Sequence, residues 1–191
     1  MGNGVDNEAE KQEHAAPIAK VRKWLEEVVI GHNFCPFAQG EFTAGRVRYR
    51  VFSGRKSKAA IAALLDEMLF LDEHREVETT LLILADGWRD FYDYLALLDR
   101  AQQALEDAAY AGVYQLASFH PDYVFAEVAV DDASNYTNRS PLPVLHLLRE
   151  SSIERAIAGD PNIDQIPERN KALARAKGVR FWQSLLAHTQ S

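Results

Sequence analysis

The class of fold is predicted by one stretch of the chain, residues 79–119, which reads TTLLILADGWRDFYDYLALLDRAQQALEDAAYAGVYQLASF. It begins with a nearly continuous apolar run at 79–85, which is typical of a central strand covered on both faces. Asp90 is a suitable N-cap for a helix whose apolar residues recur at helical spacing until Gly112. A second strand is predicted at 113–119. Two strands joined by a helical crossover are normally parallel, so the stretch indicates an α/β fold.

The sequence upstream continues this alternation of strands and helices. Residues 46–52 alternate strictly between basic and apolar side chains, which is typical of a strand with one buried face. Apolar residues then recur at helical spacing over 58–72, which predicts a helix with Ser57 as a suitable N-cap. A first helix is predicted at 17–30, because Pro17 suits a first turn and apolar residues then fall on one face.

The sequence downstream is less regular. Residues 123–130 carry a weaker pattern for a fourth strand, and a polar loop follows over 131–143. A leucine-rich helix is predicted at 144–158. A last helix opens at Pro167, with a break near Gly178.

We therefore expect an α/β fold in one domain, residues 17–188. Its sheet would be mostly parallel, with three to four strands, crossover helices, and additional helices at the N- and C-terminal ends. Residues 1–16 are polar and acidic and are expected to form a flexible N-terminal tail.

Composition narrows the classes of partner. The chain has 191 residues, 47% of them hydrophobic, which is enough for a real core. Its net charge of −7 disfavours extended nucleic-acid binding. No apolar run approaches the roughly 20 residues that span a bilayer, so we expect no membrane association. A single cysteine and no secretory signal fit a reducing compartment, and we expect a cytoplasmic protein. Neither a cofactor nor an oligomeric state follows from the sequence.

Polar groups follow three predicted strands at their carboxyl ends, at 53–57, 86–90 and 120–122. In a parallel sheet these ends share one edge, where ligands bind. Arg55 precedes a predicted helix N-terminus and is a candidate to bind a phosphate or carboxylate; the alternative is a solvated basic turn. His120 is a candidate acid or base; the alternative is a structural histidine bonded to the backbone.

The loop at 131–143 concentrates polar side chains ahead of two prolines. Asn138 and Arg139 are candidates to bind an anionic substrate, since a guanidinium grips carboxylate or phosphate through two parallel hydrogen bonds. Asp131 and Asp132 are further candidates for this substrate site. The two carboxylates could also hold a hard cation, but they lack the spacing of a known calcium loop, so we predict no metal site. The alternative is a well-bonded connection of turns and caps.

The sole cysteine, Cys35, lies in the stretch GHNFCPFAQG at 31–40. It is a candidate nucleophile, a metal ligand, or a packed thiol. A helix C-terminus precedes it and would raise the pKa of the thiol, and the neighbouring phenylalanines indicate burial. On these local grounds a packed thiol is favoured, although a histidine or arginine close in space would reverse that.

The chain resembles a bacterial family, with relatives in plant plastids, that is known only as a domain of unknown function. The matching stretches are GHNFCPFA at 31–38, LASFHPDYVFA at 116–126 and DDASNYTNRSPLPVLHLLRESSIERAI at 131–157, together with 79–99 and IPERN at 166–170. The resemblance covers about residues 17–178. It implies a small single-domain soluble protein and no particular activity, cofactor or catalytic residue.

Three functions remain open from the sequence. The first is a small enzyme acting on an anionic phosphate or carboxylate metabolite, with His120 and Cys35 as catalytic candidates. The second is a non-catalytic module that binds or senses such a metabolite. The third is an interaction protein that uses its C-terminal helix around Phe181 and Trp182.

Overall fold

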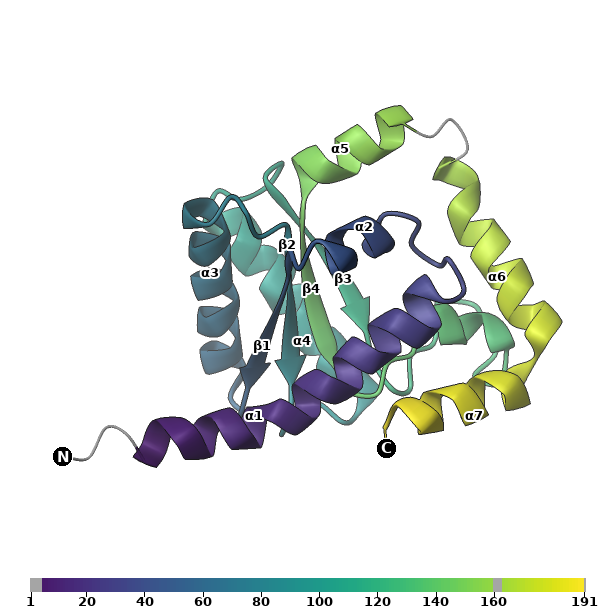
Figure 1. The fold of residues 1–191 in the computed structure, drawn as a ribbon, viewed down its shortest axis with the longest axis horizontal. Coiled ribbons are helices and arrows are strands. Elements are labelled where there is room, and N and C mark those ends of the chain that lie inside the picture. Colours follow the sequence, from purple (N-terminus) through teal and green to yellow (C-terminus); the bar gives the residue numbers. More distant parts are fainter. Residues whose placement is uncertain (1–4, 160–162, 191) are drawn as a thin grey trace.

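The computed structural model describes residues 5–159 and 163–190, and its centre is an open four-stranded sheet in the order β1-β2-β4-β3 (Figure 1). The strands are β1 (Val47–Phe52), β2 (Thr79–Leu84), β3 (Tyr114–Phe119) and β4 (Val144–Arg149). β1 pairs with β2 in parallel, whereas β4 is antiparallel to both of its neighbours. The prediction of a single α/β domain is confirmed, but that of a mostly parallel sheet is wrong.

The error arises from the segment that forms β4. Residues 144–158 were predicted as one helix, but 144–149 form a central strand and only α5 (Glu150–Gly159) is helical. A short apolar run fits a buried helix and a doubly covered strand equally well, because its periodicity does not separate the two. Here both faces of the run are covered by core residues. Residues 123–130 form no strand and belong to the connection between β3 and β4.

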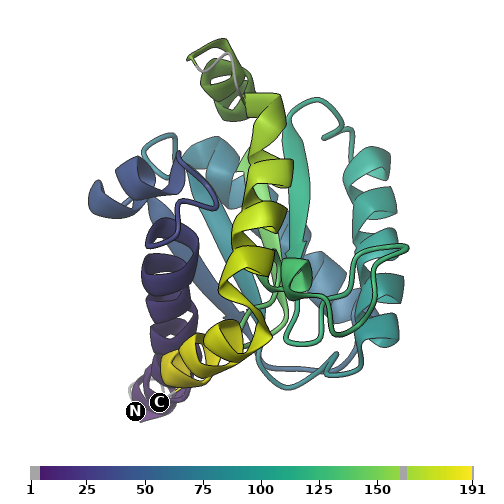
Figure 2. The same ribbon diagram turned by 90° about the vertical axis from the view of Figure 1, so that its right-hand side faces the viewer.

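Helices cover both faces of the sheet. α3 (Ser57–Glu73) and α4 (Phe91–Asp107) pack on one face, and α1 (Val5–Trp24) packs on the other with the π-helical turn η1 (Leu25–Ile30) that continues it (Figure 2). α1 begins at Val5, within the segment expected as a tail, so Pro17 lies inside the helix. The remaining elements are α2 (Ala38–Thr43), the 3-10 turns η2 (Ala133–Thr137) and η3 (Ile163–Gln165), α6 (Ile166–Lys177) and α7 (Val179–Thr189).

Two details of the C-terminal helices bear on the sequence predictions. The predicted break near Gly178 is confirmed, because this glycine separates α6 from α7 with a φ of +79°. Trp182 is 1% exposed and packs on Phe34, whereas Phe181 is 38% exposed. Only one of the two aromatic residues of the interaction hypothesis therefore offers a sizeable surface.

The directions of the strands decide where the polar strand ends meet. β4 runs opposite to β2 and to β3, so β1, β2 and β3 all point the same way (Figure 1). Their carboxyl ends therefore share one edge, as predicted, even though β4 separates β3 from the others. No helix within 5–159 and 163–190 combines the length and apolar character that crossing a bilayer requires.

Candidate functional site

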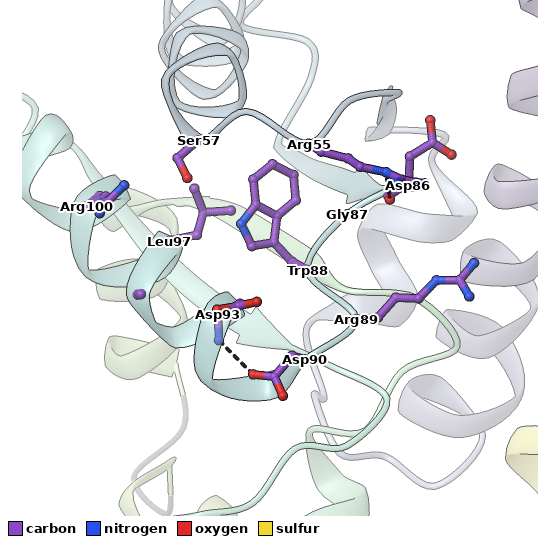
Figure 3. Close-up of a pocket in the computed structure, with 11 residues that line it drawn as sticks. Arg55, Ser57, Asp86, Gly87, Trp88, Arg89, Asp90, Asp93, Leu97 and Arg100 are labelled. Atoms are coloured by element: carbon purple, nitrogen blue, oxygen red, sulfur yellow. Dashed lines mark hydrogen bonds between the residues drawn. The ribbon is translucent and has the colours of Figure 1, made fainter.

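A polar cleft of about 690 Å³ opens at the carboxyl ends of β1 and β2 (Figure 3). It lies between the loops that leave these strands, the first turn of α3, and residues 93–100 of α4. Its wall is formed by Arg55, Ser57, Asp86, Gly87, Trp88, Arg89, Asp90, Asp93, Ala96, Leu97 and Arg100. Of the candidates chosen from sequence, only Arg55 belongs to this wall.

Two helix N-termini face the cleft, and they differ in their capping. The Asp90 carboxylate accepts hydrogen bonds from the N–H groups of Tyr92 (2.9 Å) and Asp93 (3.0 Å), so α4 is capped. α3 begins after Lys56 without any side-chain cap. Since the first N–H groups of a helix lack intrahelical acceptors, those at Ser57 stay available at the partly positive end of the helix.

The two loops that form the cleft touch each other closely. The Arg55 Nε donates a hydrogen bond to the Asp86 carbonyl oxygen at 3.0 Å. Gly87 packs against the other loop so tightly that an added Cβ would lie 3.1 Å from the Gly54 carbonyl oxygen. The positions of Arg55 and of the 86–90 loop are therefore coupled.

This packing predicts the effect of replacing Gly87 by alanine. We expect the free energy of unfolding to fall by about 1–2 kcal/mol, because the methyl group forces two backbone segments apart. Gly40→Ala is the matched control: nothing lies within 4 Å of its added Cβ, and it is helical. Alanine should stabilise that position by up to about 1 kcal/mol. Urea denaturation of both variants measures the difference, and equal stabilities would contradict the close contact.

Trp88, at the centre of the cleft, has a strained backbone. Its φ is +55°, which is unusual for a bulky side chain. Strain of this kind gathers at functional sites when the surroundings hold it in place. Here the Trp88 carbonyl oxygen accepts a hydrogen bond from the His120 Nε2 at 2.9 Å. Figure 3 shows the Trp88 indole in the middle of the cleft, while the Arg89 side chain points away from it.

His120 lies behind the loop rather than in the wall of the cleft. Its side chain is fully buried, and its Nδ1 accepts the Asp122 N–H at 3.0 Å, which places the ring proton on Nε2. Burial lowers the pKa of His120, so the ring is neutral near pH 7. Both ring nitrogens are used by backbone groups, which makes His120 a positioning residue for the Trp88 carbonyl.

The candidates from the 131–143 loop brace the connection between β3 and β4. The Arg139 guanidinium donates to the carbonyl oxygens of Tyr123 (3.2 Å) and Val130 (2.9 Å). The Asn138 Nδ2 donates to the Ser118 carbonyl oxygen at 3.1 Å. These contacts favour the alternative of a well-bonded connection, and neither residue lines the cleft at β1 and β2.

The two aspartates of this loop are also placed apart from the cleft. Asp132 caps η2 through the Ser134 N–H and pairs with the Arg175 Nε at 3.0 Å. The hydrogen bond from Arg175 lowers the pKa of Asp132 to about 2. Asp131 is exposed. In the part of the chain that the structure describes, no three histidine, cysteine, aspartate or glutamate side chains gather as they would around a metal ion.

Cys35 is far from these residues in the fold, since it lines a cavity at the opposite end of the sheet. Burial raises the pKa of its thiol, and the N–H groups of Phe37 and Ala38 oppose this only in part. The structure therefore separates the candidates: Arg55 lines the cleft, His120 supports it from behind, and Cys35 lies elsewhere.

Some residues of the cleft were missed from the sequence. Asp93, Leu97 and Arg100 come from α4, at positions i, i+4 and i+7. This spacing marks one helix face, which was not singled out from the sequence. The sequence signal for them is their position in the first turns of a helix that follows directly after a strand end and carries a recognisable N-cap, Asp90.

In comparisons with known proteins, the chain matches one family model. A family model with the description "Protein of unknown function (DUF1415)" matches residues 16–184. No curated protein and no solved structure matches the chain.

Proposed function

The chain belongs to this family of proteins of unknown function, and we propose that it binds a small anionic molecule, a phosphate or carboxylate compound, in the cleft at β1 and β2. The observation that carries the proposal is the uncapped N-terminus of α3 beside Arg55, at the edge where three strands end. Helix N-termini attract anions through free N–H groups and the helix dipole, and an adjacent guanidinium adds charge.

The charges of the cleft indicate where the anion would lie. The wall holds three arginines and three aspartates, but the Asp90 carboxylate is already used to cap α4. Asp93 lies on the α4 side and repels an anion there. Arg55 uses only its Nε in contacts with the described residues, so its terminal nitrogens are open to a ligand. The anion is therefore expected on the α3 side.

Further donors lie on the same side. The Ser57 hydroxyl and the Trp88 indole N–H have no hydrogen-bond partner among residues 5–159 and 163–190. The face of the Trp88 ring, which is half-buried, adds apolar surface that suits an aromatic or otherwise planar group on the ligand. An aromatic phosphate or carboxylate therefore fits better than inorganic phosphate alone.

The wall favours a binding module over an enzyme. Its lining residues include no histidine, which is the most frequent general base, and no cysteine, which is a strong nucleophile. The buried His120 acts on the Trp88 carbonyl and not on the cleft. An enzyme would have to use carboxylates such as Asp93 as its acid or base.

Calorimetric titration with phenyl phosphate, benzoate and inorganic phosphate tests the proposal. Ser57→Pro tests the contribution of the backbone N–H at this position, because proline is tolerated at the first helical position yet removes one N–H donor. Lys56 already has the extended conformation that a following proline requires. We expect Arg55→Ala and Ser57→Pro each to weaken binding of phenyl phosphate about tenfold.

Two controls make the result decisive. Ser57→Ala removes only the hydroxyl and should weaken binding less than Ser57→Pro, whereas Arg180→Ala on the exposed side of α7 should bind like the unmodified protein. The proposal fails if none of the probes binds at millimolar concentration, or if the two cleft variants bind as tightly as Arg180→Ala. Release of phenol from phenyl phosphate during long incubation would instead indicate an enzyme.

A further inference from the structure

A second cavity, of about 520 Å³, lies at the opposite end of the sheet. It is bounded by η1, the Cys35 loop, α2 and α5, and its floor is the sheet at the amino ends of β1 and β2. Figure 1 shows α2 and α5 at this end of the sheet. Its wall is mostly apolar, with Leu25 from η1, Phe37 from the Cys35 loop, and Ile153 and Ala156 from α5. The volume is within the roughly 300–1,000 Å³ typical of small-molecule sites.

Two polar side chains that contact each other, Thr79 and His146, interrupt the apolar floor. The Thr79 hydroxyl donates to the Leu147 carbonyl oxygen and is 2.6 Å from the His146 Nε2. A hydroxyl has one proton, so this second contact requires the His146 Nε2 to be the donor. The Nδ1 is then an acceptor, and it has no hydrogen-bond partner within the described residues.

The cavity offers no free charge to a ligand. Burial lowers the pKa of His146 to about 4, so the ring is neutral near pH 7. At the rim, Glu41 pairs with Arg46 at 2.6 Å and Glu78 with Arg155 at 3.6 Å. An uncharged ligand is therefore favoured over an anion or a cation, whose desolvation would not be offset.

Arg149 lines the cavity but is also occupied. Its guanidinium donates to the carbonyl oxygens of Leu71 and Val77, and its side chain is buried. It therefore offers no counterion to a ligand.

The backbone beside the cavity is irregular in a way that binding sites often are. η1 is a π-helical turn, and such turns occur frequently at functional sites. It ends at Gly31, where an added Cβ would lie only 2.4 Å from the Glu27 carbonyl oxygen. The chain then turns so that Cys35 and Phe37 reach the cavity, with Phe37 38% exposed at its rim.

We propose that this cavity binds a small, uncharged, largely apolar molecule with one hydroxyl or N–H group that donates a hydrogen bond to the His146 Nδ1. The apolar wall takes up most of the molecule, and the single acceptor in the floor orients it. The site is separate from the anion cleft, which lies at the other edge of the sheet.

A matched pair of probes tests the donor requirement. 1-Naphthol carries a hydroxyl donor, whereas 1-methoxynaphthalene has the same ring system and no donor. Equilibrium dialysis should show 1-naphthol binding about tenfold more tightly, the effect of one buried hydrogen bond. In His146→Phe the two probes should bind alike. Because Cys35 is the sole thiol, 1-naphthol should also slow its alkylation by iodoacetamide.

The location is tested by filling the cavity. Ala156→Phe places a ring in the cavity and should abolish binding of 1-naphthol, whereas Ala158→Phe, on the exposed side of the same helix, should leave it unchanged. Equal affinity for both probes, tighter binding of 1-naphthoate, or unchanged binding in Ala156→Phe would overturn the proposal. If Ala156→Phe does not fold, the difference in affinity between 1-naphthol and 1-methoxynaphthalene for the unmodified protein still tests the proposal.

Discussion

Replacing Trp24 by alanine is expected to lower the free energy of unfolding by about 3–5 kcal/mol. Trp24 is 1% exposed and ends α1 against the sheet. Its ring meets the edge of Phe119 with 5.0 Å between centroids, and its Nε1 donates to the Arg139 carbonyl oxygen at 2.9 Å. The substitution removes this packing and leaves a cavity. It also leaves the Arg139 carbonyl oxygen, in the connection between β3 and β4, without its hydrogen-bond donor.

Two variants separate these contributions. Trp24→Phe keeps much of the apolar contact but removes the N–H donor, so a loss of about 1–3 kcal/mol is expected. Tyr92→Ala removes an aromatic ring that is 80% exposed and should change stability by no more than about 0.5 kcal/mol. Urea denaturation followed by far-ultraviolet circular dichroism measures all three. A Trp24→Ala protein within 1 kcal/mol of the unmodified one would show that this contact does not anchor α1.

The elements that the sequence predicted well have an unambiguous period. β1 alternates between arginines and apolar residues, and α4 carries apolar residues at helical spacing after the cap at Asp90. The sequence of β4 shows neither the alternation of a half-buried strand nor the spacing of an amphipathic helix. Both of its faces are buried, and leucine occurs in helices and strands alike. Its placement between β2 and β3 also depends on pairing between distant segments, which a local pattern does not contain.

The location of the polar cleft at β1 and β2 was partly predicted from the sequence, because β1, β2 and β3 point the same way even with β4 inserted between them. For His120 and Arg139 the sequence left open both a chemical and a structural role, because both side chains bind backbone groups whose positions exist only in the folded connection. Residue type alone suggested acid–base chemistry and anion binding for them. The geometry instead makes them supports for loops.

The same inserted strand accounts for the second cavity. Because β4 runs against its neighbours, its carboxyl end reaches the edge where β1 and β2 begin. α5 therefore leaves the sheet there and closes the cavity over His146. The helix predicted over 144–158 would have placed His146 on a helix surface and hidden the site.

The second large effect is expected in mild acid, where stability should fall between pH 6.5 and pH 4. Burial lowers the pKa of His146 to about 4 and also lowers that of His120, whereas both rings titrate near 6.5 when unfolded. The unfolded chain then binds more protons, so the stabilisation is complete above pH 6.5 and is lost as the pH falls toward the folded values. For His146 alone the loss is on the order of 3 kcal/mol.

The carboxylate of Asp132 does not obscure this window. Arg175 lowers the pKa of Asp132 to about 2, so stability from that group is lost only below about pH 4, where an unfolded aspartate takes up its proton. Urea denaturation at intervals from pH 7.5 to pH 4.5 measures the slope. His146→Gln and His120→Gln should each flatten it, and the double variant should be flatter still. A residual slope is expected from His32, because burial and the charge of a nearby lysine lower its pKa. A slope in the double variant as steep as in the unmodified protein, or a flat profile in the unmodified protein, would mean that these two imidazoles are not held neutral by burial.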